Sequence, residues 1–157
     1  TIIDRVDNTC KSFQRKNFFK VYLINPSMRA ALFDTITDSS EMVGNLAETA
    51  IISQWFHSDH RADLKYSRWK NGEVDIVRVD PRTQKPEWAV EIKWSDAYFA
   101  NPTKLKSLIH FAQKNDLTNV TATSKTQTGV TPIEGRSIEH VPSSLYCYTV
   151  GRNLTLG

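Results

Sequence analysis

Apolar residues between positions 43 and 55 recur three and four residues apart, which predicts an amphipathic helix. Asp38, followed three residues later by Glu41, forms an acidic variant of a capping box and places the helix start just before this stripe. The stripe consists of Val43, Leu46, Ala47, Ala50, Ile51 and Trp55. Glu48 lies beside it, so the helix carries a carboxylate next to its buried side.

From residue 64 onward the side-chain pattern repeats every two residues, which predicts strands. A strand over residues 64–69 ends at Asn71-Gly72, a strong signal for a two-residue hairpin turn. The following strand, residues 73–79, must therefore pair with it antiparallel. Residues 88–94 are rich in side chains that suit a pleated sheet, so they predict a third strand and complete a three-stranded meander.

Weaker signals complete the order of elements. The further elements are a strand at 21–24, a short helix at 27–33, a helix from Asn101 to about Asn115, a strand around 120–122, a loop at 129–135 and a last strand at 138–141. Residues 1–20 are mostly polar and predict a linker or the tail of a preceding region, which leaves residues 21–157 as one domain. This order indicates an α/β (α+β) fold with a central mixed sheet flanked by helices.

The composition excludes several classes of protein. Of 157 residues, 39% are hydrophobic and 24% charged, which is enough for one core but not for two full-sized domains. No window approaches the roughly 18 consecutive apolar residues that a membrane span needs, so no membrane partner is predicted. The net charge of +3 favours a polyanionic partner only weakly.

The positions of the cysteines and glycines exclude several kinds of site. Cys10 and Cys147 lack the spacing of a zinc site or a disulfide framework, so they predict a reduced, cytoplasmic protein in which both are buried or half-buried. No glycine-rich loop carries the lysine that binds nucleotide phosphates. The chain is therefore not expected to contain an ATP site.

The side chains that could carry out chemistry lie on the predicted meander. At the end of the strand over residues 88–94, Glu91 and Lys93 are expected to point to the same face. On the preceding strand, Asp75 is expected to share a face with Val77, which brings it next to Glu91. Two neighbouring carboxylates repel each other, and a bound Mg or Mn ion relieves that cost. Lys93 would stabilise negative charge that develops on a phosphoryl group.

These residues resemble a known motif. Glu48 on a helix, Asp75 after a hairpin turn and Glu91-Ile92-Lys93 at a strand end are similar to the motif of the PD-(D/E)xK nuclease superfamily. That superfamily has a restriction-endonuclease-like core with the order αβββαβ, which matches the predicted order. The chain also resembles, over roughly residues 20–145, the C-terminal domain of unknown function of bacterial and archaeal AAA-type ATPases. The segments that carry this resemblance are Lys20-Val-Tyr-Leu-Ile-Asn-Pro-Ser, Gly44-Asn-Leu-Ala-Glu48, Gly72-Glu-Val-Asp75 and Val90-Glu-Ile-Lys93.

The resemblance implies a role for each motif residue. Asp75 and Glu91 would bind Mg or Mn, and the backbone carbonyl of Ile92 would be a third ligand. Glu48 would be an accessory ligand or would hold a water molecule, and Lys93 would be the catalytic lysine. The implied activity is phosphodiester cleavage or DNA binding. The implied partner is an ATPase module of the same parent chain, which a winged-helix region ending within residues 1–20 would connect to this domain.

Two other functions remain open on the sequence. The domain could be a catalytically silent interaction or regulatory module of the ATPase, with an ion pair of Lys93 as a structural relic. ATP hydrolysis would then be the activity of the parent protein and would reside in the N-terminal part that this sequence lacks. His110 and His140 show no partner in the sequence and are expected at surface or boundary positions. The pattern indicates no oligomeric state.

Overall fold

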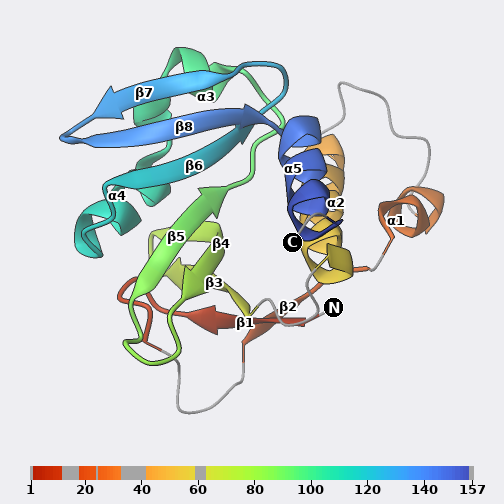
Figure 1. The fold of residues 1–157 in the computed structure, drawn as a ribbon, viewed down its shortest axis with the longest axis horizontal. Helices are drawn as coiled ribbons and strands as arrows, with labels where there is room; N and C mark the ends of the chain where they lie inside the picture. Colours follow the sequence, from red (N-terminus) through yellow and green to blue (C-terminus); the bar gives the residue numbers. More distant parts are fainter. Residues whose placement is uncertain (1, 12–17, 24, 33–41, 59–62, 156–157) are drawn as a thin grey trace.

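An eight-stranded mixed sheet forms the centre of the computed structural model, which describes residues 2–11, 18–23, 25–32, 42–58 and 63–155 (Figure 1). Its strands follow the spatial order β2-β1-β3-β4-β5-β6-β8-β7. The strands are β1 (Ile2–Val6), β2 (Phe19–Val21), β3 (Leu64–Trp69), β4 (Gly72–Val79), β5 (Pro86–Glu91), β6 (Asn119–Ser124), β7 (Gly129–Ile133) and β8 (Arg136–Pro142). The helices are α1 (Pro26–Leu32), α2 (Met42–Ser58), α3 (Ala97–Ala100), the 3-10 turn η1 (Pro102–Lys104), α4 (Lys106–Lys114) and α5 (Ser143–Thr155). The expected α/β fold with a mixed sheet flanked by helices is confirmed.

The predicted three-stranded meander is present. β3 pairs antiparallel with β4, and β4 pairs antiparallel with β5. Trp69 lies opposite Gly72 at the hairpin, and a Cβ atom at Gly72 would collide with the Trp69 ring, so this turn needs glycine for steric reasons. β6 then pairs in parallel with both β5 and β8. This arrangement places β6 beside the end of β5, where the candidate site lies.

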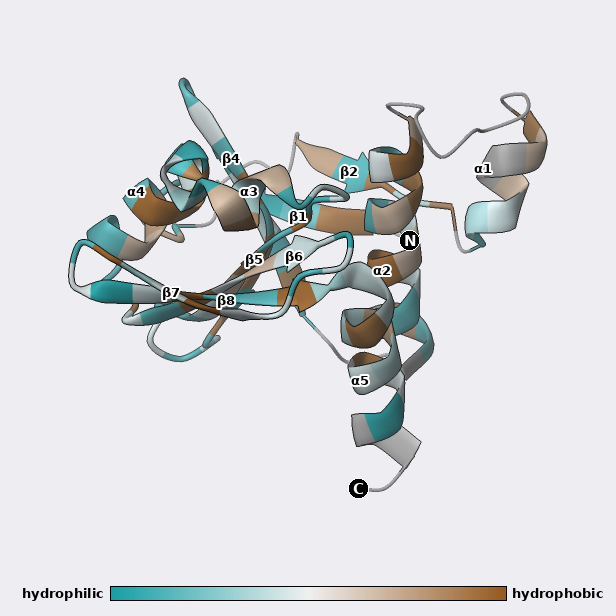
Figure 2. Cartoon of the chain, turned by 90° about the horizontal axis from the view of Figure 1, so that it is seen from above, coloured by the Kyte–Doolittle hydropathy of each residue, from teal (hydrophilic) through white to brown (hydrophobic). Residues whose placement is uncertain are grey.

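The sheet separates two hydrophobic core clusters, and helices cover it. α4 packs against β4, β5 and β6, and its buried Leu108 and Phe111 belong to one cluster with Val77 of β4. α2 buries Ile51 and Ile52 in the other cluster. α5 lies along α2, and both helices stand apart from α4 in Figures 1 and 2. Figure 2 shows hydrophobic turns of α2. No described helix combines the length and the apolar character that crossing a bilayer requires.

Two N-terminal strands extend the sheet beyond the predicted meander. β1 pairs in parallel with β3, and β2 pairs antiparallel with β1 as the edge strand. Ile3 and Val6 of β1 are buried, but they lie three residues apart with two charged residues between them, so the segment shows no strand-like alternation. β1 therefore belongs to the sheet, although residues 1–20 were expected to form a linker or tail.

Other segments also differ from their predictions. The strand expected at residues 21–24 lies earlier in the chain, and Tyr22 follows β2 as a buried residue outside it. The segment that begins at Gly129, expected to be a loop, forms β7 and pairs antiparallel with β8. α5 had no signal that we recognised in the sequence. The capping box at Asp38 and Glu41 lies outside the described residues.

Candidate functional site

The structure brings the strand-end carboxylates and Lys93 together. β4 and β5 pair in a register that sets Asp75 beside Glu91. The backbone N–H of Ile92 donates a hydrogen bond to Asp75 Oδ2 at 2.8 Å, which ties the end of β5 to this carboxylate. Lys93 Nζ lies 2.8 Å from Glu91 Oε1. Three of the motif side chains therefore lie within one connected polar cluster.

A register shift interrupts the alternation of β4 next to the site. β3 and β4 slip by one residue between Lys65 and Ser67, which is the signature of a β-bulge. As a consequence Val74 and Val77 pack in the same core cluster, whereas Ile76 packs in the other. The strict alternation that we used to assign faces along β4 is therefore wrong at this point, because the bulge adds a residue to one strand only.

Glu48 reaches the same cluster through residues of the N-terminal segment. From α2, Glu48 Oε1 accepts hydrogen bonds from Tyr22 Oη and from Lys20 Nζ, the latter at 3.2 Å. Lys20 Nζ also lies 3.7 Å from Asp75 Oδ1 and forms an ion pair with Glu73. Sequence reasoning missed Lys20 as a site residue, because its segment was assigned to a linker.

Burial and like charge shift the titration of the two central acids. Burial raises the pKa of Asp75, and the neighbouring Glu48 carboxylate raises it further. Burial also raises the pKa of Glu91, with the Asp75 carboxylate as the next cause. Burial lowers the pKa of Lys93, but the Glu91 and Asp75 carboxylates outweigh this and raise it overall. The two acids therefore resist ionisation together, and a bound cation would remove that cost.

The carboxylate oxygens of the cluster are donor atoms that suit a hard divalent cation, but they do not complete a metal site. Glu91 Oε2 is buried and has no hydrogen-bond partner among the described residues, which leaves a desolvated carboxylate oxygen next to Asp75. Within the described residues, however, no group of three or more His, Cys, Asp or Glu side chains meets the geometry of a metal site. A cation would therefore need a ligand of another kind, and the predicted one is the backbone carbonyl of Ile92.

Residues of β6 and α5 hold the backbone of Lys93 in place. Thr123 Oγ1 accepts a hydrogen bond from Lys93 N–H at 2.8 Å and lies 2.9 Å from Lys93 O, to which it can donate. Ser143 Oγ lies 3.2 Å from the carbonyl oxygen of Ser124 and 3.4 Å from that of Lys93. The ammonium group lies 5.5 Å from the centre of the Tyr98 ring. The contacts with Thr123 and Ser143 have no local sequence signal, because they join segments 30 and 50 residues apart in the chain.

His140 does not lie where the sequence suggested. It was expected at a surface or boundary position, but it is fully buried in β8, and neither ring nitrogen has a hydrogen-bond partner among the described residues. Its ring meets the edge of Phe99 with centroids 5.2 Å apart. The expectation was wrong because β7 and the Phe99 segment cover this position, and neither contact is local in sequence. His110, by contrast, is exposed.

We predict that His140→Leu reduces the loss of stability in acid. Burial lowers the pKa of His140 below its ordinary 6.5, so the unfolded chain binds more protons and the folded chain loses stability as the pH falls below about 6.5. Urea unfolding at about pH 5 and pH 7.5 should show a loss about 1 kcal/mol smaller in the variant than in the wild type. Equal losses in the two proteins would contradict a neutral, unpaired His140.

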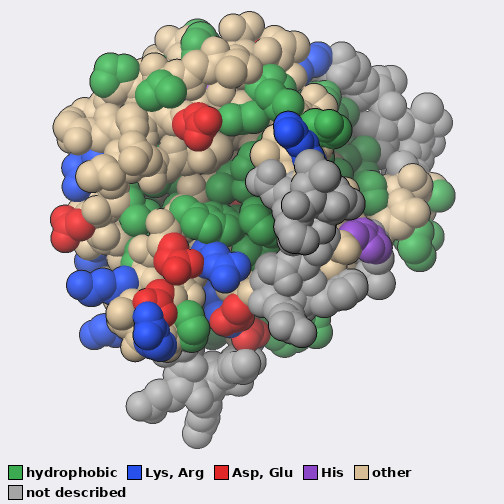
Figure 3. Space-filling view, in the orientation of Figure 1, with side chains coloured by type: hydrophobic (Ala, Val, Ile, Leu, Met, Phe, Trp, Pro, Cys, Tyr) green, Lys and Arg blue, Asp and Glu red, His purple; other side chains and the backbone are tan. Residues whose placement is uncertain are grey.

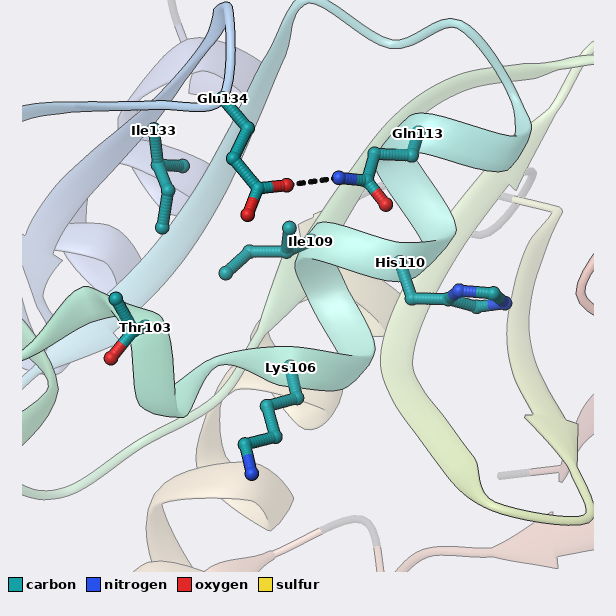
Figure 4. A pocket seen from close by; sticks show the side chains of 7 residues that line it. All are labelled: Thr103, Lys106, Ile109, His110, Gln113, Ile133 and Glu134. Atoms are coloured by element: carbon teal, nitrogen blue, oxygen red, sulfur yellow. Dashed lines mark hydrogen bonds between the residues drawn. The ribbon is translucent and has the colours of Figure 1, made fainter.

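Two pockets formed by described residues lie away from the carboxylate cluster. Figure 4 shows one of about 210 Å³ beside α4, in which Glu134 and Gln113 point toward each other and form a hydrogen bond. A second, of about 360 Å³, lies next to it and shares Lys106 and His110. None of the motif residues lines either pocket.

In Figure 3 acidic and basic side chains are interspersed over the lower half of the visible face.

Both cysteines have the burial expected from the sequence. Cys10 is fully buried and Cys147 is half-buried.

Comparison of the chain with models of known protein families, with curated proteins and with solved structures found no match. A functional conclusion must therefore be drawn from the order of the elements and from the side chains gathered around Asp75, Glu91 and Lys93.

Proposed function

We propose that this chain is a Mg- or Mn-dependent, nuclease-like domain of the PD-(D/E)xK type that binds DNA and cuts a phosphodiester bond. The observation that carries the proposal is the half-buried Asp75 beside the buried Glu91, with Lys93 bound to one of the Glu91 oxygens. The element order supports it as well, because α2, β3, β4, β5, α4 and β6 follow the αβββαβ order of the restriction-endonuclease-like core.

Each residue of the cluster would have a distinct task. Asp75 and Glu91 would hold the cation with the Ile92 carbonyl, and Glu48 would be an accessory ligand or would hold a water molecule. A divalent cation supplies a Lewis acid for phosphoryl chemistry. Thr123 holds the backbone of Lys93, and Glu91 holds its ammonium group at 2.8 Å, so the ammonium can stabilise the negative charge that develops on the phosphate.

We further propose that the domain works within a larger protein. On the sequence resemblance, it would be the C-terminal domain of an AAA-type ATPase in the cytoplasm, and the ATPase module of the same parent chain would govern its activity. β1 lies between β2 and β3 in the sheet, so any connection to a preceding module would reach the sheet at β1.

DNA affinity should depend strongly on salt. The chain has a net charge of only +3, and charges of both signs are interspersed on the face in Figure 3, so phosphate contacts must come from a local set of lysines. We expect the affinity for a double-stranded oligonucleotide, measured by fluorescence anisotropy, to fall at least about tenfold when salt rises from about 50 to 200 mM. An affinity that stays flat over this range would contradict DNA binding through phosphates.

A silent interaction module is the second candidate, and one observation favours it. Glu48, Glu73 and Asp75 all have Lys20 as a cationic neighbour, and Glu91 has Lys93, so the cluster can hold its charges without a metal. Such internal pairing is compatible with a site that has lost its activity.

A cleavage assay separates the two candidates. The wild-type chain is incubated with double-stranded DNA, single-stranded DNA or single-stranded RNA in the presence of Mn or Mg, and with EDTA as the control. Cleavage that requires the cation and stops with EDTA would support the nuclease. Absence of cleavage of all three substrates with either cation would instead favour the silent module.

A further inference from the structure

A lysine ammonium lies among three carboxylates of the candidate site. Lys20 Nζ is 3.2 Å from Glu48 Oε1 and 3.7 Å from Asp75 Oδ1, and it forms an ion pair with Glu73 Oε1. Its charge also lies 5.1 Å from the centre of the Tyr66 ring. The ammonium thus has a set of oxygen neighbours like the one that a bound cation would require.

The cluster still carries more negative than positive charge. When ionised, Glu48, Glu73, Asp75 and Glu91 exceed Lys20 and Lys93 by two charges; the exposed Arg68, 3.5 Å from Glu73, reduces this excess to one. A second, independent feature points to a missing ligand. Glu91 is only 8% exposed, and its Oε2 atom has no hydrogen-bond partner among the described residues.

Lys20 is also placed so that it can leave. It belongs to β2, the edge strand of the sheet, and about a quarter of its side chain is exposed to solvent. Lysine carries its charge on a flexible four-carbon stem and is well hydrated in water. The ammonium can therefore move into solvent by rotation about side-chain bonds, without a change in the backbone of the sheet.

We propose that Lys20 is a built-in counter-ion that holds the cation position of the carboxylate cluster and is displaced when a divalent metal ion binds. This inference rests on the proposed function, because it concerns the same metal site. The ammonium and a metal ion require the same oxygens of Asp75 and Glu48, so they compete. Lys20 consequently stabilises the metal-free chain and lowers its apparent affinity for the metal.

Two variants isolate this competition. Lys20→Met keeps an unbranched apolar stem of four heavy atoms and removes the ammonium group with its charge. Lys65→Met is a matched control, because Lys65 is also half-buried on the sheet but pairs with Asp63 and Asp4 outside the cluster. In calorimetric titrations with MnCl2 at pH 7.5, we expect the dissociation constant to fall about tenfold or more in Lys20→Met and to stay within about twofold in the control.

A measurement on the wild type follows the displacement itself and does not depend on how the variants fold. Lysine amines are acetylated briefly with and without saturating MnCl2, and the products are quantified by peptide mass spectrometry. The acetylation of Lys20 should rise several-fold with Mn, because the displaced amine gains access to the reagent, whereas that of Lys65 should not change.

The outcomes distinguish this inference from the proposed function. If Mn binds the wild type but neither the affinity of Lys20→Met nor the acetylation of Lys20 increases, the competition is overturned while the metal site stands. If Lys20→Met binds Mn more weakly than the wild type, Lys20 assists the metal instead of competing with it, and the inference is again overturned. If no protein binds Mn or Mg, the proposed metal site fails, and the inference fails with it.

Discussion

Replacing Lys93 with methionine should lower the rate of DNA cleavage at least about a hundredfold. Lys93 Nζ pairs with Glu91, and hydrogen bonds to Thr123 fix its backbone, whereas the ammonium of Lys20 lies among Glu48, Glu73 and Asp75. Removal of a positive charge beside a carboxylate should not weaken Mn binding. The measurement is single-turnover cleavage at saturating Mn, together with a calorimetric titration of each protein.

The exposed Lys85 offers the control for this variant. Lys85→Met removes an equal charge from the turn before β5 and should leave the cleavage rate within about twofold of the wild type. A Lys93→Met protein that binds Mn and still cleaves at the wild-type rate would show that this lysine has no part in the chemistry.

Replacing Glu91 with glutamine should change how the stability of the metal-free chain depends on pH. Burial raises the pKa of Glu91 from its ordinary 4.5 to about 8, so between these values the folded chain binds more protons than the unfolded chain. The contribution of Glu91 is therefore fully present below about pH 4.5 and is lost as the pH rises toward 8. Because the glutamine amide does not titrate, we expect the variant to lose less stability over this range, by on the order of 2 kcal/mol.

Urea unfolding of both proteins in the presence of EDTA, at about pH 5, 6.5 and 8, measures this difference. The comparison of wild type with variant removes the contributions of titrating groups that lie away from Glu91. A wild type that gains stability relative to Glu91→Gln as the pH rises would contradict a carboxyl group whose ionisation is opposed by burial.

The meander and its motif could be predicted because their signals are local. Alternation and the Asn71-Gly72 turn determine that β3 and β4 form a hairpin, and the residues of β5 then lie beside β4. The adjacency of Asp75 and Glu91 follows from this pairing. The bulge in β4 could not be predicted from alternation, because it is a property of the paired strands and not of one strand.

The rest of the cluster depends on contacts between distant segments. Lys20 comes from a three-residue edge strand whose pairing with β1 has no local pattern, and Thr123 reaches Lys93 only after β6 has paired with β5. The residues around His140 likewise give no sign that it is buried. Its neighbours are β7 and Phe99, and neither lies next to it in the sequence. Residues that complete a site from outside its motif are therefore the part that sequence reasoning misses.

The central claim is that Asp75 and Glu91 form a divalent-cation site. It is tested most directly by calorimetric titration of Mn and Mg into the wild type and into Asp75→Asn. This variant removes the charge but keeps an oxygen that can accept the hydrogen bond from the Ile92 N–H. We predict saturable binding to the wild type and a loss of affinity of at least about a hundredfold in the variant. Absence of binding to the wild type, or equal binding to both proteins, would contradict the account.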